Sequence, residues 1–165
     1  MGFIGVICGL KSEAEAVSAS VDKNTAGAKI RIGVSGANAA RAEEIATKFC
    51  NDGASAIISV GVSGGLDPAL KPGDLIIGET VIADDGSVYS ADKYLLSVIR
   101  EQFPEDSMFA PLFGADEIID SALKKSVLFS NHRAVAVDME SHGAARAAAH
   151  AGAPFIAIRA IADPA

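Results

Sequence analysis

Residues 134–163 read AVAVDMESHGAARAAAHAGAPFIAIRAIAD, the segment with the clearest pattern of secondary structure. Two short apolar runs, 134–137 and 155–158, are typical of buried strands. The alanine-rich segment between them, 143–151, favours a helix, and Gly152 stands where a C-cap glycine belongs. The unit therefore predicts two parallel neighbouring strands joined by a right-handed crossover helix.

Strands and helices alternate along the rest of the chain as well. Further strands are predicted at residues 3–8, 29–34, 56–60, 74–78 and 108–113, and helices at 11–20, 38–49, 91–102 and 118–129. Pro111 lies inside one predicted strand, which favours an edge position for that strand. No repeat and no linker interrupts this order. We therefore expect one domain over residues 1–165, an α/β three-layer sandwich around a mainly parallel sheet.

Composition and charge exclude several classes of function. Hydrophobic residues make up 50% of the chain and charged residues 21%, which is typical of a globular protein and not of a disordered one. The net charge is −7, and no basic cluster exceeds the pair Lys124 and Lys125, so we expect no binding to nucleic acid. No apolar run reaches membrane-spanning length, and residues 1–10 lack a secretory signal. These features predict a cytoplasmic protein without a membrane span.

Cysteine and histidine usage indicates neither a metal site nor a redox site. Cys8 and Cys50 have no metal or redox spacing, so we expect both thiols to be reduced. His132, His142 and His150 also lack the spacing of metal ligands, and the last two lie eight positions apart on one predicted helix. The sequence therefore predicts no metal and no cofactor.

Three acidic residues lie at the ends of predicted strands. Glu140 follows strand 134–137, Asp163 follows strand 155–158, and Glu13 lies in the first turn of the helix after the first strand. Ligands of open parallel sheets bind at the carboxyl ends of the strands. Cleavage of a glycosidic bond commonly needs one carboxyl group to protonate the leaving group and a second to activate water. The three acids are therefore candidates for this chemistry.

A glycine-rich segment, Gly61-Val62-Ser63-Gly64-Gly65, directly follows the predicted strand 56–60. Glycines let the backbone approach a ligand closely. Pro68 and Pro72 follow the segment where a dinucleotide-binding motif would begin a helix, so the segment is interpreted as a loop without that function.

Three segments resemble a known superfamily of enzymes. VGVSGGLDPALKPGDLIIGETV (residues 60–81) and VDMESHGAARAAAHAGAPFIAIRAIAD (137–163) resemble purine nucleoside phosphorylases and nucleosidases. VICGLKSEAEAV (6–17) is similar to the start of methylthioadenosine/S-adenosylhomocysteine nucleosidases. DMESHGAARAA (138–148) further resembles the hopanoid-associated phosphorylase branch, which is thought to remove adenine from adenosylhopane. The resemblance implies a nucleoside phosphorylase-like fold and cleavage of an N-glycosidic bond in a purine nucleoside.

The resemblance also implies a role for each matched residue. Asp163 is expected to protonate N7 of the leaving purine, and Glu13 to activate water. Glu140 is expected to hold the ribose hydroxyls. The other implied binding residues are Met139 on the sugar, Ser63 and Gly64 along the base pocket, and Ile118 over the purine.

Departures from the superfamily pattern bear on the nucleophile. Hexameric phosphorylases bind phosphate through an arginine and a serine at the positions of Ser59 and Val62, and this chain lacks both while it carries Glu13. Lys11 is either a replacement cation or a solvated lysine at the start of a helix. We therefore expect hydrolysis without a cofactor, and in the alternative of phosphorolysis phosphate is the co-substrate. Ala162 stands where nucleosidases carry a serine, and the change removes a hydrogen bond that would orient Asp163.

Relatives continue past the acid into a C-terminal helix, so the resemblance predicts a domain that lacks this helix. It also implies a homodimer that binds a small purine nucleoside. Two alternatives to an enzyme stay open. One is a nucleoside-binding module without turnover, and the other is an unrelated flavodoxin-like or receiver-like α/β domain.

Overall fold

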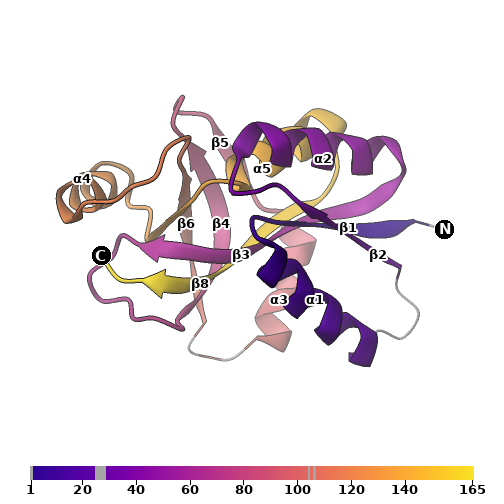
Figure 1. The fold of residues 1–165 in the computed structure, drawn as a ribbon, viewed down its shortest axis with the longest axis horizontal. Helices are drawn as coiled ribbons and strands as arrows, with labels where there is room; N and C mark the ends of the chain where they lie inside the picture. The colour runs from indigo at the N-terminus through magenta and orange to yellow at the C-terminus, as the bar shows by residue number, and fades with distance from the viewer. Residues whose placement is uncertain (1, 25–28, 104, 106) are drawn as a thin grey trace.

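The fold is built on a mixed sheet with helices on both faces (Figure 1). The computed structural model describes residues 2–24, 29–103, 105 and 107–165. In chain order the elements are β1 (Phe3–Cys8), α1 (Lys11–Asn24), β2 (Ile30–Val34), α2 (Ala39–Asn51), β3 (Ala54–Gly65), β4 (Leu75–Ala83), β5 (Val88–Ser90), α3 (Lys93–Gln102), β6 (Met108–Gly114), α4 (Ala122–His132), β7 (Ala136–Asp138), α5 (Ser141–Ala151) and β8 (Phe155–Asp163). The predicted α/β three-layer fold is confirmed.

Strand β3 is the centre of the sheet. β1 and β8 run parallel to it on its two sides, and β7 pairs antiparallel with its last residues, Gly64 and Gly65. β8 also pairs with β4, β4 with β6, and β6 with β7, so that β3, β8, β4, β6 and β7 close into a ring. β2 extends the sheet beyond β1, and β5 extends it beyond β4.

The predicted pairing of the two strands around α5 is wrong. β7 pairs with β3 and β6, whereas β8 pairs with β3 and β4, and the two lie on opposite sides of β3. They also point in opposite directions, because β3 is antiparallel to β7 and parallel to β8. The reason is the length of β3, whose 12 residues offer one side to β1 and then to β7.

The glycine-rich segment 61–65 is part of β3, so its interpretation as a loop is wrong. Gly64 and Gly65 pair with Val137 and Ala136 of β7, and Gly64 also pairs with Asp163 of β8. Pairing on both sides of Gly64 and on one side of Gly65 holds these glycines in extended backbone, although glycine by itself disfavours a strand.

The edge position predicted for the strand around Pro111 is also wrong. β6 lies between β4 and β7. Pro111 pairs with Thr80 where the register of β4 shifts between Gly78 and Thr80, so its missing N–H falls at an irregularity of the ladder.

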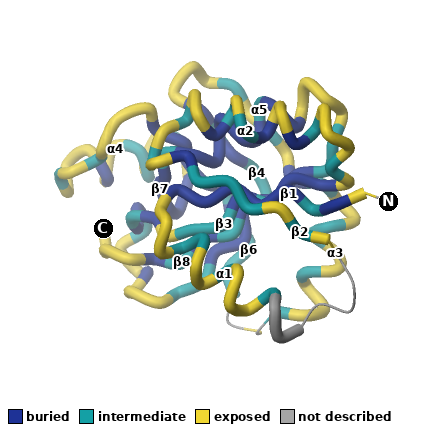
Figure 2. Tube along the Cα trace, turned by 45° about the vertical axis from the view of Figure 1, so that its right-hand side comes forward, coloured by how far each residue is buried: buried dark blue, intermediate teal, exposed yellow. Residues whose placement is uncertain are grey.

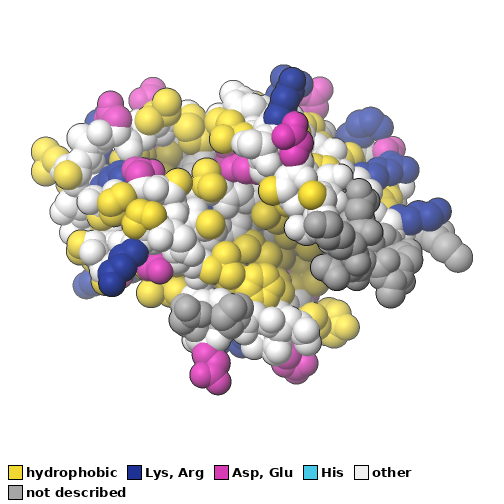
Figure 3. All heavy atoms as spheres, turned by 60° about the horizontal axis from the view of Figure 1, so that its bottom comes forward, with side chains coloured by type: hydrophobic (Ala, Val, Ile, Leu, Met, Phe, Trp, Pro, Cys, Tyr) yellow, Lys and Arg dark blue, Asp and Glu magenta, His cyan; other side chains and the backbone are white. Residues whose placement is uncertain are grey.

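The helices cover the two faces unequally. α2 and α5 lie together on one face, and α1 and α3 lie on the other (Figure 1). α5 is largely buried, whereas α1 and α3 expose most of their residues (Figure 2). On the α1 and α3 side, hydrophobic side chains reach the surface (Figure 3), and Ile58, Leu75 and Ile158 there are only partly buried. None of the helices in the described part of the chain is long and apolar enough to cross a membrane.

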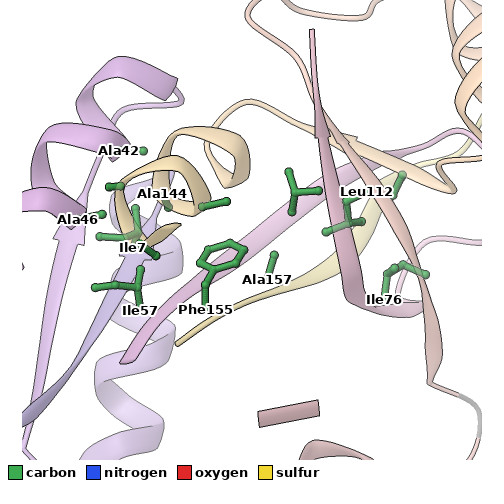
Figure 4. Close-up of a cluster of buried hydrophobic side chains, with 14 of the residues drawn as sticks. Ile7, Ala42, Ala46, Ile57, Ile76, Leu112, Ala144, Phe155 and Ala157 are labelled. Atoms are coloured by element: carbon green, nitrogen blue, oxygen red, sulfur yellow. The ribbon is translucent and has the colours of Figure 1, made fainter. Parts of the chain in front are cut away.

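Close packing of α2 on α5 positions the start of α5. A β-carbon at Gly143 would overlap the backbone carbonyl of Ala39 at the start of α2. Below the helices, alanines meet branched and aromatic side chains of the strands (Figure 4). The side chains that Figure 4 labels in this cluster are Ile7, Ala42, Ala46, Ile57, Ile76, Leu112, Ala144, Phe155 and Ala157. The glycine at 143 therefore fixes the position of the helix that Glu140 precedes.

Candidate active site

Two backbone amides from distant parts of the chain hold the carboxylate of Glu13. Oε2 accepts a hydrogen bond from the N–H of Leu10 at 2.8 Å, which closes the first turn of α1. Oε1 accepts a hydrogen bond from the N–H of Val62 in β3 at 2.9 Å. Residue 61, next to Val62, must be a glycine, because a β-carbon at Gly61 would lie 2.8 Å from Oε1 of Glu13. Glu13 is therefore fixed against β3.

Glu140 lies beside Glu13. A β-carbon at Gly9 would overlap Oε1 of Glu140 and would lie 3.4 Å from Oε2 of Glu13, so the two carboxylates flank the same glycine. Glu140 is buried, and its pKa is raised to about 7. The main cause is burial, and the second is the charge of Asp138. The charge of Arg159 lowers the pKa, and the charge of Glu13 raises it further. Glu140 therefore titrates near neutral pH, unlike an ordinary carboxyl group.

A buried ion pair supports the backbone that carries Glu140. Nε of Arg159 donates to Oδ2 of Asp138 at 3.0 Å, and Oδ1 of Asp138 accepts from the N–H groups of Glu140 and Ser141 at 2.9 and 2.7 Å. Burial acts to raise the pKa of Asp138, but the Arg159 charge and these N–H groups outweigh it and leave the pKa below its ordinary value. Asp138 is therefore ionised, and it fixes the turn between β7 and α5.

Ser59 belongs to the same buried network. Its hydroxyl accepts a hydrogen bond from Nη2 of Arg159 at 2.7 Å, and its carbonyl accepts from Nη1 at 2.9 Å. Cys8 lies nearby, and burial first and the charge of Glu13 second raise the pKa of its thiol to about 11. A thiol with this pKa stays protonated at neutral pH, so Cys8 is not a nucleophile of the site.

Asp163 ends β8 at the other side of the site. A β-carbon at Gly64 would lie 3.3 Å from its Oδ1 atom, and Nζ of Lys125 lies 2.5 Å from its Oδ2 atom. The side chain of Asp163 is 66% exposed. It lines a cavity of about 150 Å³, whose other lining residues are Gly64, Glu117, Ile118, Ile119, Val137, Asp138 and Met139.

The predicted site residues form two adjoining groups. Glu13 and Glu140 flank Gly9, whereas Asp163 lines the 150 Å³ cavity without either of them. Strand β3 joins the groups, because Val62 binds Glu13 and Gly64, two positions later, lies against Asp163. The other predicted residues that line the cavity are Gly64, Met139 and Ile118.

Ser63 and Ile118 differ in burial. Ser63 is buried, and its hydroxyl has no hydrogen-bond partner in the described part of the chain. A buried hydroxyl without a partner is costly, but Ser63 does not line the 150 Å³ cavity. Ile118 is 71% exposed, because α4 begins only after the N-cap Ser121 and leaves Ile118 in the preceding loop. The helix predicted from residue 118 therefore starts later than expected.

Lys125 is the residue that sequence reasoning missed. It is buried on α4, next to Asp163 and 38 positions before it in the sequence. A helical period places Lys125 on the same face as Leu128 and Phe129, which pack against the core, and a cation on an apolar face was the available signal. Among the residues that the structure describes, no group of three His, Cys, Asp or Glu side chains could hold a metal ion.

Known proteins share this fold and parts of this sequence. The chain is 27% identical over 128 residues to the 5′-methylthioadenosine/S-adenosylhomocysteine nucleosidase of Marinomonas sp. (strain MWYL1). That match covers 65% of this chain and 55% of the relative, so the chain spans about half the length of the curated relative it matches.

Two solved structures illustrate the similarity of fold. A 5′-methylthioadenosine/S-adenosylhomocysteine nucleosidase from Neisseria meningitidis, in complex with methylthio-immucillin-A, has a TM-score of 0.90 at 20% identity, over 99% of this chain and 86% of that chain. Futalosine hydrolase of Helicobacter pylori strain 26695 has a TM-score of 0.84 at 19% identity, over 99% of this chain and 88% of that chain. At these identities the structures establish the fold alone.

The family assignment rests on a match over nearly the whole chain. The model of the phosphorylase superfamily matches residues 3–165, which include both acid groups and the glycines of β3. The resemblance of the sequence to this superfamily is therefore confirmed, and the chain belongs to the phosphorylase superfamily.

Proposed function

We propose that this protein hydrolyses the N-glycosidic bond of an adenine nucleoside whose ribose is modified at the 5′ carbon. The observation that carries the proposal is the placement of the three acids. Glu13 and Glu140 flank Gly9, and Asp163 lies against Gly64, two positions along β3 from the amide that binds Glu13. This arrangement offers two carboxyl groups to a ribose and a third to the base attached to it.

Each acid has one step in the proposed reaction. Asp163 gives a proton to N7 of the purine, and the electron pair of the bond between C1′ and N9 leaves with the base. Glu140 binds the ribose hydroxyls while positive charge develops on the sugar, as in other glycoside cleavages. Glu13 takes a proton from water, and the water oxygen attacks C1′. The products are adenine and the 5′-modified ribose.

Two cavities near the acids are assigned to the two ends of such a nucleoside. The base occupies the 150 Å³ cavity beside Asp163, where Gly64 and Met139 also line the wall. A second cavity of about 310 Å³ begins at Gly9, next to Glu140, and accepts the 5′ substituent. Its lining residues are Gly9, Leu10, Lys11, Val34, Gly36 and Arg41.

Phosphorolysis is the second candidate, and one observation favours it. Lys11 and Arg41 both line the cavity at Gly9, where an anion close to the sugar would meet two cations. The position of Ser59 opposes it, because that hydroxyl is buried against Arg159 and is not open to phosphate. Water is therefore the preferred nucleophile.

Adenine release from 5′-methylthioadenosine, with and without added phosphate, tests the proposal. We expect release in phosphate-free buffer, and we expect Glu13→Gln to abolish it. Release that requires phosphate would replace hydrolysis by phosphorolysis. Calorimetric binding of the nucleoside without any release, even on long incubation, would identify a binding module.

Three further properties remain predictions. Adenosylhopane, the substrate implied by the resemblance to the hopanoid-associated branch, can be compared with 5′-methylthioadenosine in the same assay. The expected homodimer is measured by light scattering in solution. The expected cytoplasmic location is measured by cell fractionation.

A further inference from the structure

A buried lysine contacts the proposed general acid. Lys125 is only 7% exposed, and its Nζ atom donates to Oδ2 of Asp163 at 2.5 Å and to the carbonyl of Pro164 at 2.6 Å. Lysine is almost never buried unless its charge is paired. The proposed reaction gives Lys125 no task, so its position at the acid needs an explanation.

The lysine occupies one oxygen of the carboxyl group and leaves the other free. Oδ2 accepts a hydrogen bond from Lys125, whereas Oδ1 has no hydrogen-bond donor among the described residues. A β-carbon at Gly64, which lines the base cavity together with Asp163, would lie 3.3 Å from Oδ1 and 3.6 Å from Oδ2. Oδ1 is therefore the oxygen that stays open to a purine in that cavity.

No other side chain among the described residues donates a hydrogen bond to the carboxylate of Asp163. The residue before Asp163 is Ala162, which has no hydroxyl group, and Lys125 is the one hydrogen-bond donor to the Asp163 carboxylate in the described part of the chain. With 66% of its side chain exposed, Asp163 is not held in place by packing. Its orientation depends on α4.

We propose that Lys125 is the positioning residue of the general acid Asp163, an inference that rests on the proposed hydrolysis. Lys125 turns Oδ1 toward N7 of the purine and keeps its own protons throughout. Asp163, which is exposed to solvent, takes up a proton on Oδ1 before the reaction. When this proton passes from Oδ1 to N7, the carboxylate forms again, and the ammonium group of Lys125 stabilises its charge. Because this stabilisation is larger after the proton has left, it acts on the transition state more than on the bound substrate.

The test compares two substrates that differ in their need for an acid. 5′-Methylthioadenosine needs protonation of its base, whereas 4-nitrophenyl β-D-ribofuranoside releases nitrophenolate without a proton. The variants are Lys125→Met, Lys125→Arg and, as a matched control, Lys124→Met. Lys124 is the next residue on the same helix and pairs with the exposed Asp120 at 3.1 Å.

We expect Lys125→Met to lower kcat for 5′-methylthioadenosine by about 10- to 100-fold, a part of the whole effect of a general acid, with KM nearly unchanged. Cleavage of the nitrophenyl riboside should change by no more than about twofold, because its leaving group departs without a proton from Asp163. Lys125→Arg should restore part of the lost kcat, and Lys124→Met should match the wild-type protein.

Two results would overturn the role of Lys125. One is an equal loss on both substrates, which indicates a structural role, and the other is no loss on 5′-methylthioadenosine. If Lys125→Met does not fold, as judged by its thermal unfolding, Lys125→Gln takes its place in the comparison. If the wild-type protein cleaves neither substrate, the proposed function itself fails and the role of Lys125 falls with it.

Discussion

The two ends of the site are built differently. At the proposed sugar end, Glu13 accepts hydrogen bonds from two backbone amides, and Glu140 follows a turn that is held by the buried pair of Asp138 and Arg159. At the proposed base end, Asp163 is 66% exposed and pairs with Lys125. Glu13 and Glu140 are therefore fixed by the core, whereas the side chain of Asp163, at the end of β8, is held by one ion pair.

Because of this difference, we expect substitutions at the two ends to affect the reaction and the free energy of unfolding differently. A change at the base end should affect the reaction and leave the free energy of unfolding nearly unchanged. A change at the sugar end should affect both, because the residues that hold the carboxylates also hold the sheet together.

Asp163→Asn should lower kcat for adenine release by about 10²- to 10⁴-fold, because the amide cannot give a proton to the leaving base. The unfolding temperature should stay close to that of the wild-type protein, since the side chain is mostly exposed. Steady-state kinetics and thermal unfolding measure the two effects. Asp120→Asn, an exposed acid before α4, is the control. A loss smaller than about tenfold would place the general acid elsewhere.

Arg159→Met should lower the free energy of unfolding by about 3–5 kcal/mol, because it leaves the buried Asp138 without its partner. Arg100→Met removes an exposed pair with Glu79 and should cost about 1 kcal/mol or less. Urea unfolding of both variants gives the comparison. Equal costs for the two arginines would show that the sugar end is not supported by its buried pair.

Gly61→Ala should lower kcat by about 100-fold, because the added β-carbon meets Glu13 and displaces its carboxylate. Gly2→Ala is the matched control, since a β-carbon there lies 3.4 Å from Ser55, an ordinary contact. Steady-state kinetics of the two variants compare their kcat values. Wild-type activity in Gly61→Ala would mean that the position of Glu13 does not limit the reaction.

The raised pKa of Glu140 predicts a pH-dependent stability. A carboxyl group whose pKa is raised to about 7 in the folded state stabilises the fold most below its unfolded pKa, and this contribution is lost as the pH rises through about 7. The stability of the wild-type protein relative to Glu140→Gln should therefore fall between pH 5 and pH 8, by on the order of 2 kcal/mol. Urea unfolding at each pH measures the difference. A difference that stays constant with pH would contradict the raised pKa.

Local patterns predicted the elements well where one face of a segment is buried. The apolar run at the start of the chain forms β1 over Phe3–Cys8, as expected, and Gly152 ends α5 in the left-handed conformation with φ of 64°. Such features depend on residues within one or two turns of each other, so the sequence shows them directly. The same holds for the place of Glu13, Glu140 and Asp163 at the ends of their elements.

Pairing between distant segments was predicted poorly. The glycines of β3 were interpreted as a loop because their local preference is for turns, yet pairing with β7 and β8 makes them a strand. Pro111 favours an edge by the same local rule, but a register shift in β4 accommodates it inside the sheet. In both places the partner strand outweighs the local preference.

Local sequence patterns identified most strands and helices, the superfamily and the three candidate acids, since each depends on residues close together along the chain, but they did not predict β5. Two features become visible only in the folded chain. β7 and β8 each pair with β3 but not with each other, and Lys125 contacts Asp163, which lies 38 positions later in the sequence. The physical reason is that the energy of an ion pair or a strand ladder depends on which side chains meet after folding. A pattern of neighbouring residues does not show which distant residues will be in contact.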